Sequence, residues 1–167
     1  MSPHGLQDAL LLRSQGHLEE ALEVLRALRA GAPDDPVLAL HTAMTHDSLG
    51  HESEAIPLYE EALAKGLAGE ERRAALLGLG SSYRCVGQLE ASERVLRQAM
   101  GEFPEAAEFP AFLALTLYDQ GRSGEAVQLL MATLLDTTED PGLKRYEQAL
   151  RAYASGLAEP SSHQERL

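Results

Sequence analysis

The stretch LLGLGSSYRCVGQLE, residues 76–90, allows two opposite interpretations of the chain. Its glycines, Gly78, Gly80 and Gly87, lie among small residues, as they do in a loop that holds a phosphate. The same letters fit one turn of a helical repeat, in which small residues let two helices approach closely. The first interpretation predicts an enzyme, and the second predicts a binding scaffold.

A search for internal similarity favours the repeat. Four segments, RSQGHLEEAL, DSLGHESEAI, RCVGQLEASE and YDQGRSGEAV, each carry a glycine followed five residues later by a small residue. The glycines are Gly16, Gly50, Gly87 and Gly121, so their spacings are 34, 37 and 34 residues. The small residues are Ala21, Ala55, Ser92 and Ala126. A period near 34 residues predicts a repeat protein.

Other positions keep the same distance from each turn glycine. Seven residues before it are Ala9, Ala43, Gly80 and Ala114. Four before it are Leu12, His46, Tyr83 and Leu117, and nine after it are Leu25, Tyr59, Leu96 and Leu130. We expect the small residues to mark close helix contacts and the larger ones to fill the space beside them. Pro33 and Pro104 each follow a turn glycine by seventeen residues, where a proline would end a helix.

These positions resemble the tetratricopeptide repeat, a helix-turn-helix unit of 34 residues. The third unit carries most of the family pattern, in Leu79, Gly80, Tyr83, Gly87, Leu96, Ala99 and Pro104. The family's early tryptophan is replaced by Leu76, and Ser92 replaces the usual alanine after the turn. In the first unit Asp8 occupies an apolar position and Leu28 a small one, and the fourth has Thr138 in place of the closing proline.

The resemblance implies an all-α fold, an α-solenoid of four helical pairs in a right-handed superhelix with a C-terminal capping helix. The pairs are expected at 3–14 with 18–30, 36–48 with 53–65, 70–85 with 89–101, and 105–119 with 123–136. The repeats themselves span about 3–33, 36–67, 70–104 and 105–138, and the cap spans 140–155. We expect residues 1–158 to form a single domain, and 159–167 to be a flexible tail.

The phosphate-loop interpretation lacks its structural context. A dinucleotide fingerprint needs a buried strand before the glycines and a third glycine three residues after the second. Here EERRAALL precedes them with a helical pattern, and Tyr83 occupies the third-glycine position. No cofactor is predicted.

Composition narrows the classes of partner that the chain is expected to bind. The chain has 167 residues and a net charge of −12, which disfavours nucleic acid and anionic membranes and mildly favours basic partners. Neither a signal peptide nor an apolar run of about 18 residues is found. The single cysteine, Cys85, is typical of a reducing compartment, so we expect a cytoplasmic protein. Twelve arginines against two lysines, Lys65 and Lys144, are common in proteins from GC-rich bacterial genomes.

No residue pattern predicts a catalytic or metal site. His41 and His46 are five residues apart, about 140° around a helix, and so do not share a face. His17 and His51 occupy equivalent turn positions, and His4 and His163 lie near the ends of the chain. Cys85 has no neighbouring Cys or His, and most carboxylates are expected on solvated helix faces, as in Glu19, Glu20, Glu23, Glu60 and Glu61.

The resemblance implies that the first helix of each unit lines a concave groove that holds peptides or helices. The matching positions, counted from the turn glycines, give the candidate partner-binding residues Leu6, Leu10, Arg13, Leu40, His41, Met44, Asp47, Leu77, Gly78, Ser81, Arg84, Leu115 and Tyr118. Each leucine here has two interpretations, contact with a partner or packing between helices. Gly78 also has two, since its missing side chain leaves room for a ligand or simply weakens the helix.

The family's carboxylate clamp for the tails of heat-shock chaperones is not expected. Its equivalent positions hold Leu6, Leu10, His41, Ala74 and Gly78, and none of these pairs with a carboxylate as lysine or arginine does. An apolar or helical ligand fits better, with Arg13 and Arg84 as anchors for its acidic groups. The sequence therefore predicts a non-catalytic protein-interaction module; the alternative is a structural protein that self-associates through its apolar groove face.

Overall fold

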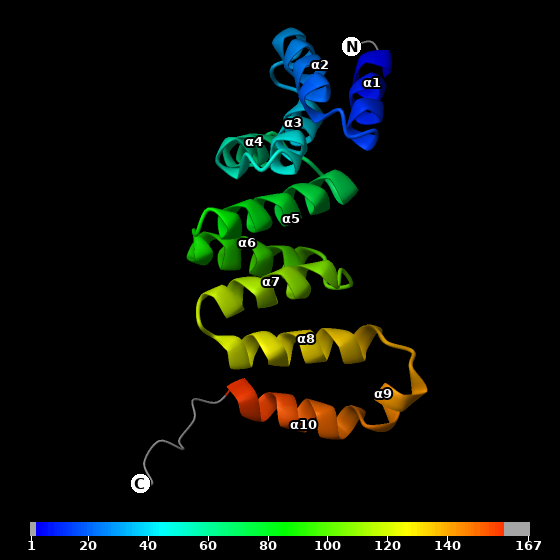
Figure 1. Ribbon diagram of the computed structural model, residues 1–167, viewed down its shortest axis with the longest axis vertical. Helices are drawn as coiled ribbons and strands as arrows, with labels where there is room; N and C mark the ends of the chain where they lie inside the picture. Colours follow the sequence, from blue (N-terminus) through cyan, green and yellow to red (C-terminus); the bar gives the residue numbers. More distant parts are fainter. Residues whose placement is uncertain (1–2, 159–167) are drawn as a thin grey trace. The chain divides into compact units, whose positions relative to one another are not determined.

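The computed structural model describes residues 3–158, and all of its regular secondary structure in that range is helical (Figure 1). The chain divides into two compact units, residues 1–88 and 89–167, and each is described by itself. The tail predicted at 159–167 lies outside the described residues.

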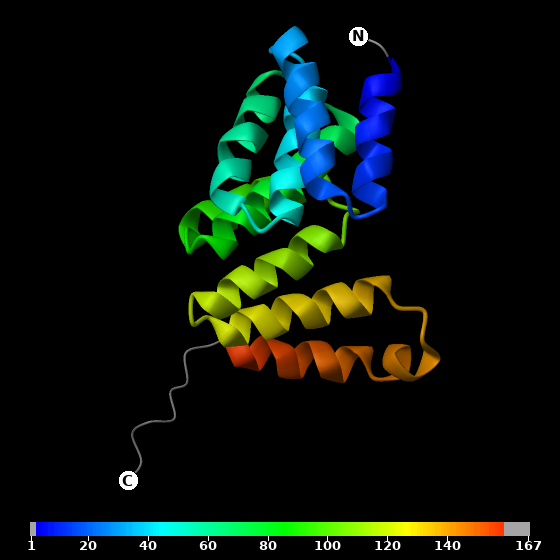
Figure 2. The same cartoon turned by 45° about the horizontal axis from the view of Figure 1, so that its top comes forward.

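The first unit contains five helices, which pair in the order of the chain (Figure 2). They are α1 (Pro3–Ser14), α2 (Leu18–Gly31), α3 (Pro36–Ser48), α4 (Glu52–Ala64) and α5 (Gly69–Cys85). Consecutive helices contact each other, and α3 also contacts α5. Asp35 caps α3 by accepting the backbone N–H groups of Val37 and Leu38.

The second unit contains α6 (Leu89–Glu102), α7 (Glu108–Asp119), α8 (Ser123–Thr137), α9 (Pro141–Arg145) and α10 (Glu147–Ala158). Here α6 packs on α7, α7 on α8, and α8 on α10. Both views place α8 between α7 and α10 (Figures 1 and 2).

The four predicted turn glycines all adopt positive φ, between 73° and 83°. A Cβ at any of them would meet nothing within 4 Å, so backbone conformation and not packing requires glycine there. After each glycine the next N–H bonds back to the carbonyl of the residue four before the glycine, for example Gln88 to Tyr83 at 2.8 Å. This bond satisfies a carbonyl at the end of the first helix and reverses the chain.

The predicted small residues form the close helix contacts. Ala9, Ala43, Ala114, Ala21 and Ala55 are at most 1% exposed. Ser92 is fully buried and forms a hydrogen bond with Thr116 of 2.9 Å, which explains why serine is tolerated where the family has alanine. One expected core residue behaves differently. Leu130 is 43% exposed, whereas its equivalents Leu25, Tyr59 and Leu96 are buried.

The first repeat, residues 3–33, departs from the family pattern at Leu28, where the family has a small residue, and the structure shows what accommodates the larger side chain. A Cβ on Gly5 would lie 2.9 Å from the Cδ2 of Leu28, so the glycine on α1 makes room for the larger side chain on α2. Leu28 then packs against a core of Ala9, Leu25 and Leu38. Asp8, the other residue of this repeat that departs from the family pattern, has an exposed side chain.

Two predicted helix boundaries were wrong. The helix expected from residue 105 begins at Glu108, because a start at 105 would carry Pro110 beyond the first turn, where its missing N–H would cost a hydrogen bond. The cap expected as one helix over 140–155 is divided into α9 and α10 at Tyr146. There the Tyr146 N–H bonds to the carbonyl of Leu143, three residues back, which tightens the turn and ends α9.

Candidate partner-binding surface

The helices α1, α3 and α5 of the first unit carry eleven of the thirteen candidate residues, and eight of these form one surface. Two hydrogen bonds connect the three helices: Arg13 of α1 lies 3.4 Å from His41 Nδ1 of α3, and Ser82 of α5 donates to Asp47 of α3 at 2.7 Å. We call this surface, defined by Leu6, Leu10, Arg13, His41, Met44, Leu77, Ser81 and Arg84, the inner surface.

Most residues of the inner surface are half-buried, so each presents part of its side chain to solvent. Leu6 packs partly against the core of the first two helices. Leu40 is only 2% exposed, so of its two interpretations the structure supports packing. The remaining candidates, Leu115 and Tyr118, belong to α7 in the other unit, where they are 43% and 66% exposed.

A neighbouring side chain fills the space beside Gly78, so no room is left there for a ligand. A Cβ at this position would lie 2.3 Å from Cζ and 2.4 Å from the hydroxyl oxygen of Tyr59. The phenol ring of α4 therefore uses the space that the missing side chain of α5 leaves. The glycine serves close packing between α4 and α5.

Asp47 is a structural carboxylate that connects three helices. Its Oδ2 accepts a hydrogen bond from the Tyr59 hydroxyl of α4 at 2.9 Å, and its Oδ1 accepts one from Ser82 of α5. Burial raises the pKa of Asp47 above its ordinary value, although the two hydrogen bonds oppose this shift. Burial and the Asp47 carboxylate both raise the pKa of Tyr59, so the phenol stays protonated as a donor.

Arg13 is one of the two arginines of the inner surface, the other being Arg84. Within residues 3–158 no carboxylate lies within ion-pair distance of the Arg13 guanidinium, and its one hydrogen-bond contact is with His41. Burial lowers the pKa of Arg13, and burial followed by the Arg13 charge lowers the pKa of His41. The imidazole is therefore held neutral beside a half-buried guanidinium, whose remaining donors are available to an anionic group.

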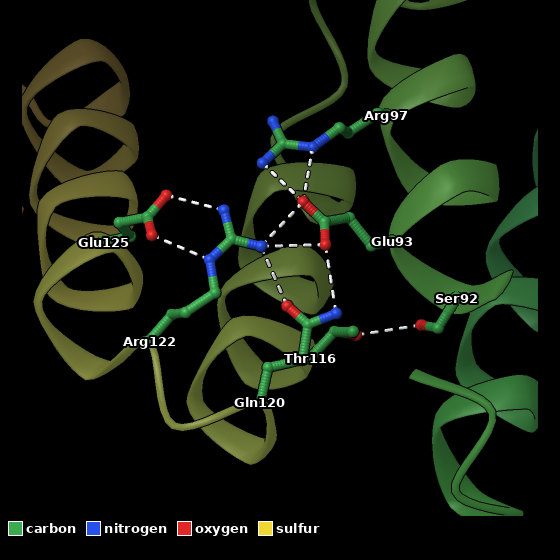
Figure 3. Close-up of polar contacts among 7 residues, drawn as sticks. All are labelled: Ser92, Glu93, Arg97, Thr116, Gln120, Arg122 and Glu125. Atoms are coloured by element: carbon green, nitrogen blue, oxygen red, sulfur yellow. Dashed lines mark hydrogen bonds and ion pairs between the residues drawn. The ribbon is translucent and has the colours of Figure 1, made fainter. Parts of the chain in front are cut away.

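A second polar cluster, around Glu93, lies in the other unit (Figure 3). Glu93 of α6 accepts hydrogen bonds from Gln120 at 3.0 Å and from Arg122 at 2.9 and 3.0 Å, and it pairs with Arg97 at 2.7 Å. Arg122 also pairs with Glu125 of α8 at 2.7 Å. The cluster ties the α7–α8 turn to α6, and its acceptors are used internally.

Sequence reasoning missed Tyr59, Ser82 and the Glu93 cluster as polar contacts. Glu93 and Arg122 are 29 residues apart, and only the packing of α6 against α7 brings them together. Tyr59 was assigned to packing by its repeat position, which is correct for its ring but does not predict its hydrogen bond to Asp47.

No group of three or more His, Cys, Asp or Glu side chains within residues 3–158 is placed to hold a metal ion. None of the helices in this range is both long enough and apolar enough to cross a membrane.

The fold has close counterparts among solved structures. MamA superposes with a TM-score of 0.70 at 19% identity, covering 90% of each chain. YrrB, described as a TPR protein with an unusual peptide-binding site, gives 0.69 at 18% identity over 94% of this chain and 82% of its own. Nearly identical TPR-like repeats of a putative kinesin light chain from Podosopora anserina give 0.67 at 22% identity, over 92% and 90%. At these identities the likeness shows the fold alone, and it confirms the predicted α-solenoid.

No curated protein sequence matches the chain. The sequence profile described as "Tetratrico peptide repeat" matches residues 36–157, which is more than half of the chain. The repeat glycines, the buried small residues and this match agree. The chain belongs to the tetratricopeptide repeat family.

Proposed function

We propose that the protein is a non-catalytic interaction module whose inner surface holds a peptide or helix of a partner protein. The family and the fold support a role in protein interaction, and tetratricopeptide repeat proteins are generally non-catalytic. YrrB, a structural relative, is described as having a peptide-binding site. The proposal places binding on α1, α3 and α5 of the first unit.

The observation that carries the proposal is that the Arg13 guanidinium has no carboxylate partner within the described residues. A half-buried guanidinium without a carboxylate partner among the described residues is unusual in a chain of net charge −12, where acidic groups are plentiful. An acidic side chain or a terminal carboxylate of a ligand would supply the missing partner through charge-assisted hydrogen bonds.

Apolar side chains belong to the same inner surface. Leu10 lies one turn before Arg13 on α1, and Met44 and Leu77 stand on α3 and α5. All three are half-buried, so each has apolar area left to bury on a ligand. The ligand that fits is a short segment with apolar residues and at least one acidic residue.

A displayed library of random peptides tests this, because the natural partner is unidentified. Selection on the wild-type protein should enrich apolar sequences that carry Asp or Glu. Arg13→Ala should weaken binding of a selected peptide by about 10- to 100-fold, the loss expected for a charge-assisted hydrogen bond. Arg26→Ala, which removes an exposed arginine of α2, is the matched control and should change nothing.

Met44→Glu extends the test to the apolar part of the surface and should also abolish binding. Circular dichroism of each variant checks that the helices remain intact. Equal binding by wild type, Arg13→Ala and Met44→Glu would show that the peptides bind elsewhere and would overturn the proposal.

A further inference from the structure

Eight of the nine large apolar side chains that are exposed in the described chain belong to the second unit. They are Leu115, Tyr118, Val127, Leu130, Leu134, Tyr146, Tyr153 and Leu157, with exposed fractions from 42% to 75%. The ninth, Leu11, lies on α1 of the first unit. Scattered exposed leucines are ordinary, but a concentration of this kind in one unit marks a surface with a function.

The three exposed apolar residues of α8 lie on one side of that helix. They are Val127, Leu130 and Leu134. Leu129, Gln128 and Ala132 line a cleft together with Arg97 of α6, so they face α6. Val127, Leu130 and Leu134 are each two residues from one of these, which is about 160° around a helix. They therefore point away from α6.

Tyr118 of α7 points to the same side. Thr116 bonds to Ser92 of α6, and Tyr118 is two residues further along, again about 160° around the helix. Leu115 precedes Tyr118 by three residues and shares its face. The exposed stripes of α7 and α8 thus lie on the side of this pair that α6 leaves uncovered.

The residues of α10 complete the surface. Arg151, Ala154 and Ser155 line a cleft with Gln128 and Ala132 of α8. Tyr153 and Leu157 are each two residues from Ser155, so they lie on the side opposite this cleft, next to the stripe of α8. Tyr146, seven residues before Tyr153, continues the same stripe. We call the eight residues together the outer apolar face.

The charged side chains of α8 and α10 lie off the outer apolar face, whereas Asp119 of α7, one turn after Leu115, lies at its edge. Glu125, Asp136, Glu147 and Arg151 are the charged residues of these two helices, and each takes part in an ion pair on the other side. A basic partner would be matched by acidic groups, which the rest of this chain has in excess. A largely uncharged apolar face is matched instead by another such face.

The exposed area is large enough for a dimer. The three tyrosines alone leave roughly 400 Å² uncovered, taking about 200 Å² for each ring and their exposed fractions of 61–75%. The five aliphatic residues bring the face to roughly 800 Å², above the largest apolar patch of a typical monomer and close to one partner's share of a standard interface.

We propose that the outer apolar face of α7, α8 and α10 binds the same face of a second copy of this chain. At this largely uncharged face, two copies of net charge −12 can approach with few like charges in contact. This inference goes beyond the proposed function and uses side chains of the other unit. It also explains why Leu130 is exposed although its repeat position predicts burial, since the partner copy would cover it.

Light scattering coupled to size exclusion, from about 1 µM to about 500 µM, tests the proposal over the affinities that an interface of this size gives. The wild-type protein should change from monomer to dimer in this range. The double variant Leu130→Glu/Tyr153→Glu should dimerise at least about 100-fold more weakly, because two charges would be buried without partners.

Leu11→Glu is the control, since it places a glutamate on an exposed leucine of the first unit, whose 57% exposure lies between those of Leu130 and Tyr153. It should dimerise like wild type, and so should Arg13→Ala, which separates this proposal from the peptide-binding one. If the double variant melts below wild type, Tyr153→Glu alone, at the residue that is 75% exposed, carries the test.

Two results would overturn the proposal. A wild-type protein that stays monomeric throughout would leave a helix of another protein as the occupant of the face. A dimer that persists in the charged variants would place self-association on another surface.

Discussion

At the scale of single residues, the positions of this chain that depart from the repeat pattern are mostly explained by one neighbour. Gly5 makes room for Leu28, Thr116 bonds to the buried Ser92, and Tyr59 fills the space beside Gly78. Each departure involves two residues that contact each other in the structure. Only one of the two differs from the repeat pattern in the sequence. That is why Gly78 could be noticed from the sequence but not explained.

Gly78→Ala should destabilise the protein by about 1–3 kcal/mol, although alanine normally favours a helix. The new Cβ would collide with the Tyr59 ring, which cannot move without losing its hydrogen bond to Asp47. Gly101→Ala in α6, where a Cβ meets nothing within 4 Å, is the control and should be neutral or stabilising. Chemical unfolding measures both.

A Tyr59→Leu background sharpens this prediction. There, Gly78→Ala should cost much less than in wild type, because the colliding phenol is gone. The same loss in both backgrounds would show that the glycine is needed for another reason.

His46 should make stability depend on pH. It is 8% exposed, its Nδ1 has no hydrogen-bond partner in the described chain, and burial lowers its pKa. The unfolded chain therefore binds a proton more readily than the folded one, so the free energy of unfolding should fall as the pH drops below about 6.5. His46→Tyr, which restores the family's residue, should flatten this dependence between about pH 7 and 5. An unchanged pH profile would contradict this role for His46.

At the scale of helices, the period of the turn glycines was enough to place most boundaries. The turns are local structures that need positive φ and a bond to the preceding helix end, and both leave a signal in a short segment. The start of α7 and the division at Tyr146 depend on a proline inside the first turn and on one three-residue hydrogen bond, which the period does not contain. The polar contacts between helices were not predictable, because their partners are far apart in the sequence.

The Glu93 cluster should stabilise the contact of α6 with the α7–α8 turn. Glu93→Gln should cost about 1–2 kcal/mol, since three donors lose a charged acceptor. Glu90→Gln, at an exposed position of the same helix, should cost nothing measurable. Urea unfolding of the two variants, side by side, makes the comparison.

The Glu93 cluster should also make the stability of the fold depend on pH in the acid range. Burial raises the pKa of Glu93, but hydrogen bonds from Gln120, Arg97 and Arg122 outweigh it, and the pKa is lowered overall. A lowered carboxylate pKa stabilises the fold above about pH 4.3, and this contribution is lost as the pH falls further. The Glu93→Gln variant should lose less stability than wild type below that pH, and an equal loss would contradict the assignment.

At the scale of the whole molecule, charge should separate the two proposed interactions. Dimerisation brings together two copies of net charge −12, so added salt should strengthen it by screening their repulsion. A selected peptide that carries one acidic and one basic residue has no net charge for the protein to repel, so its binding depends on the attraction between its carboxylate and Arg13, and salt should weaken it. Titrations of both at low and at physiological ionic strength should show opposite trends, and parallel trends would contradict one of the assignments.

The central claim is that the inner surface of the first unit receives the partner. Its most direct test is nuclear magnetic resonance of the Leu130→Glu/Tyr153→Glu variant, in which the proposed dimer should not form, on addition of a selected acidic peptide. We predict that backbone amide shifts change in α1, α3 and α5 around Arg13, His41 and Met44. Shift changes confined to α7, α8 and α10 would contradict the claim.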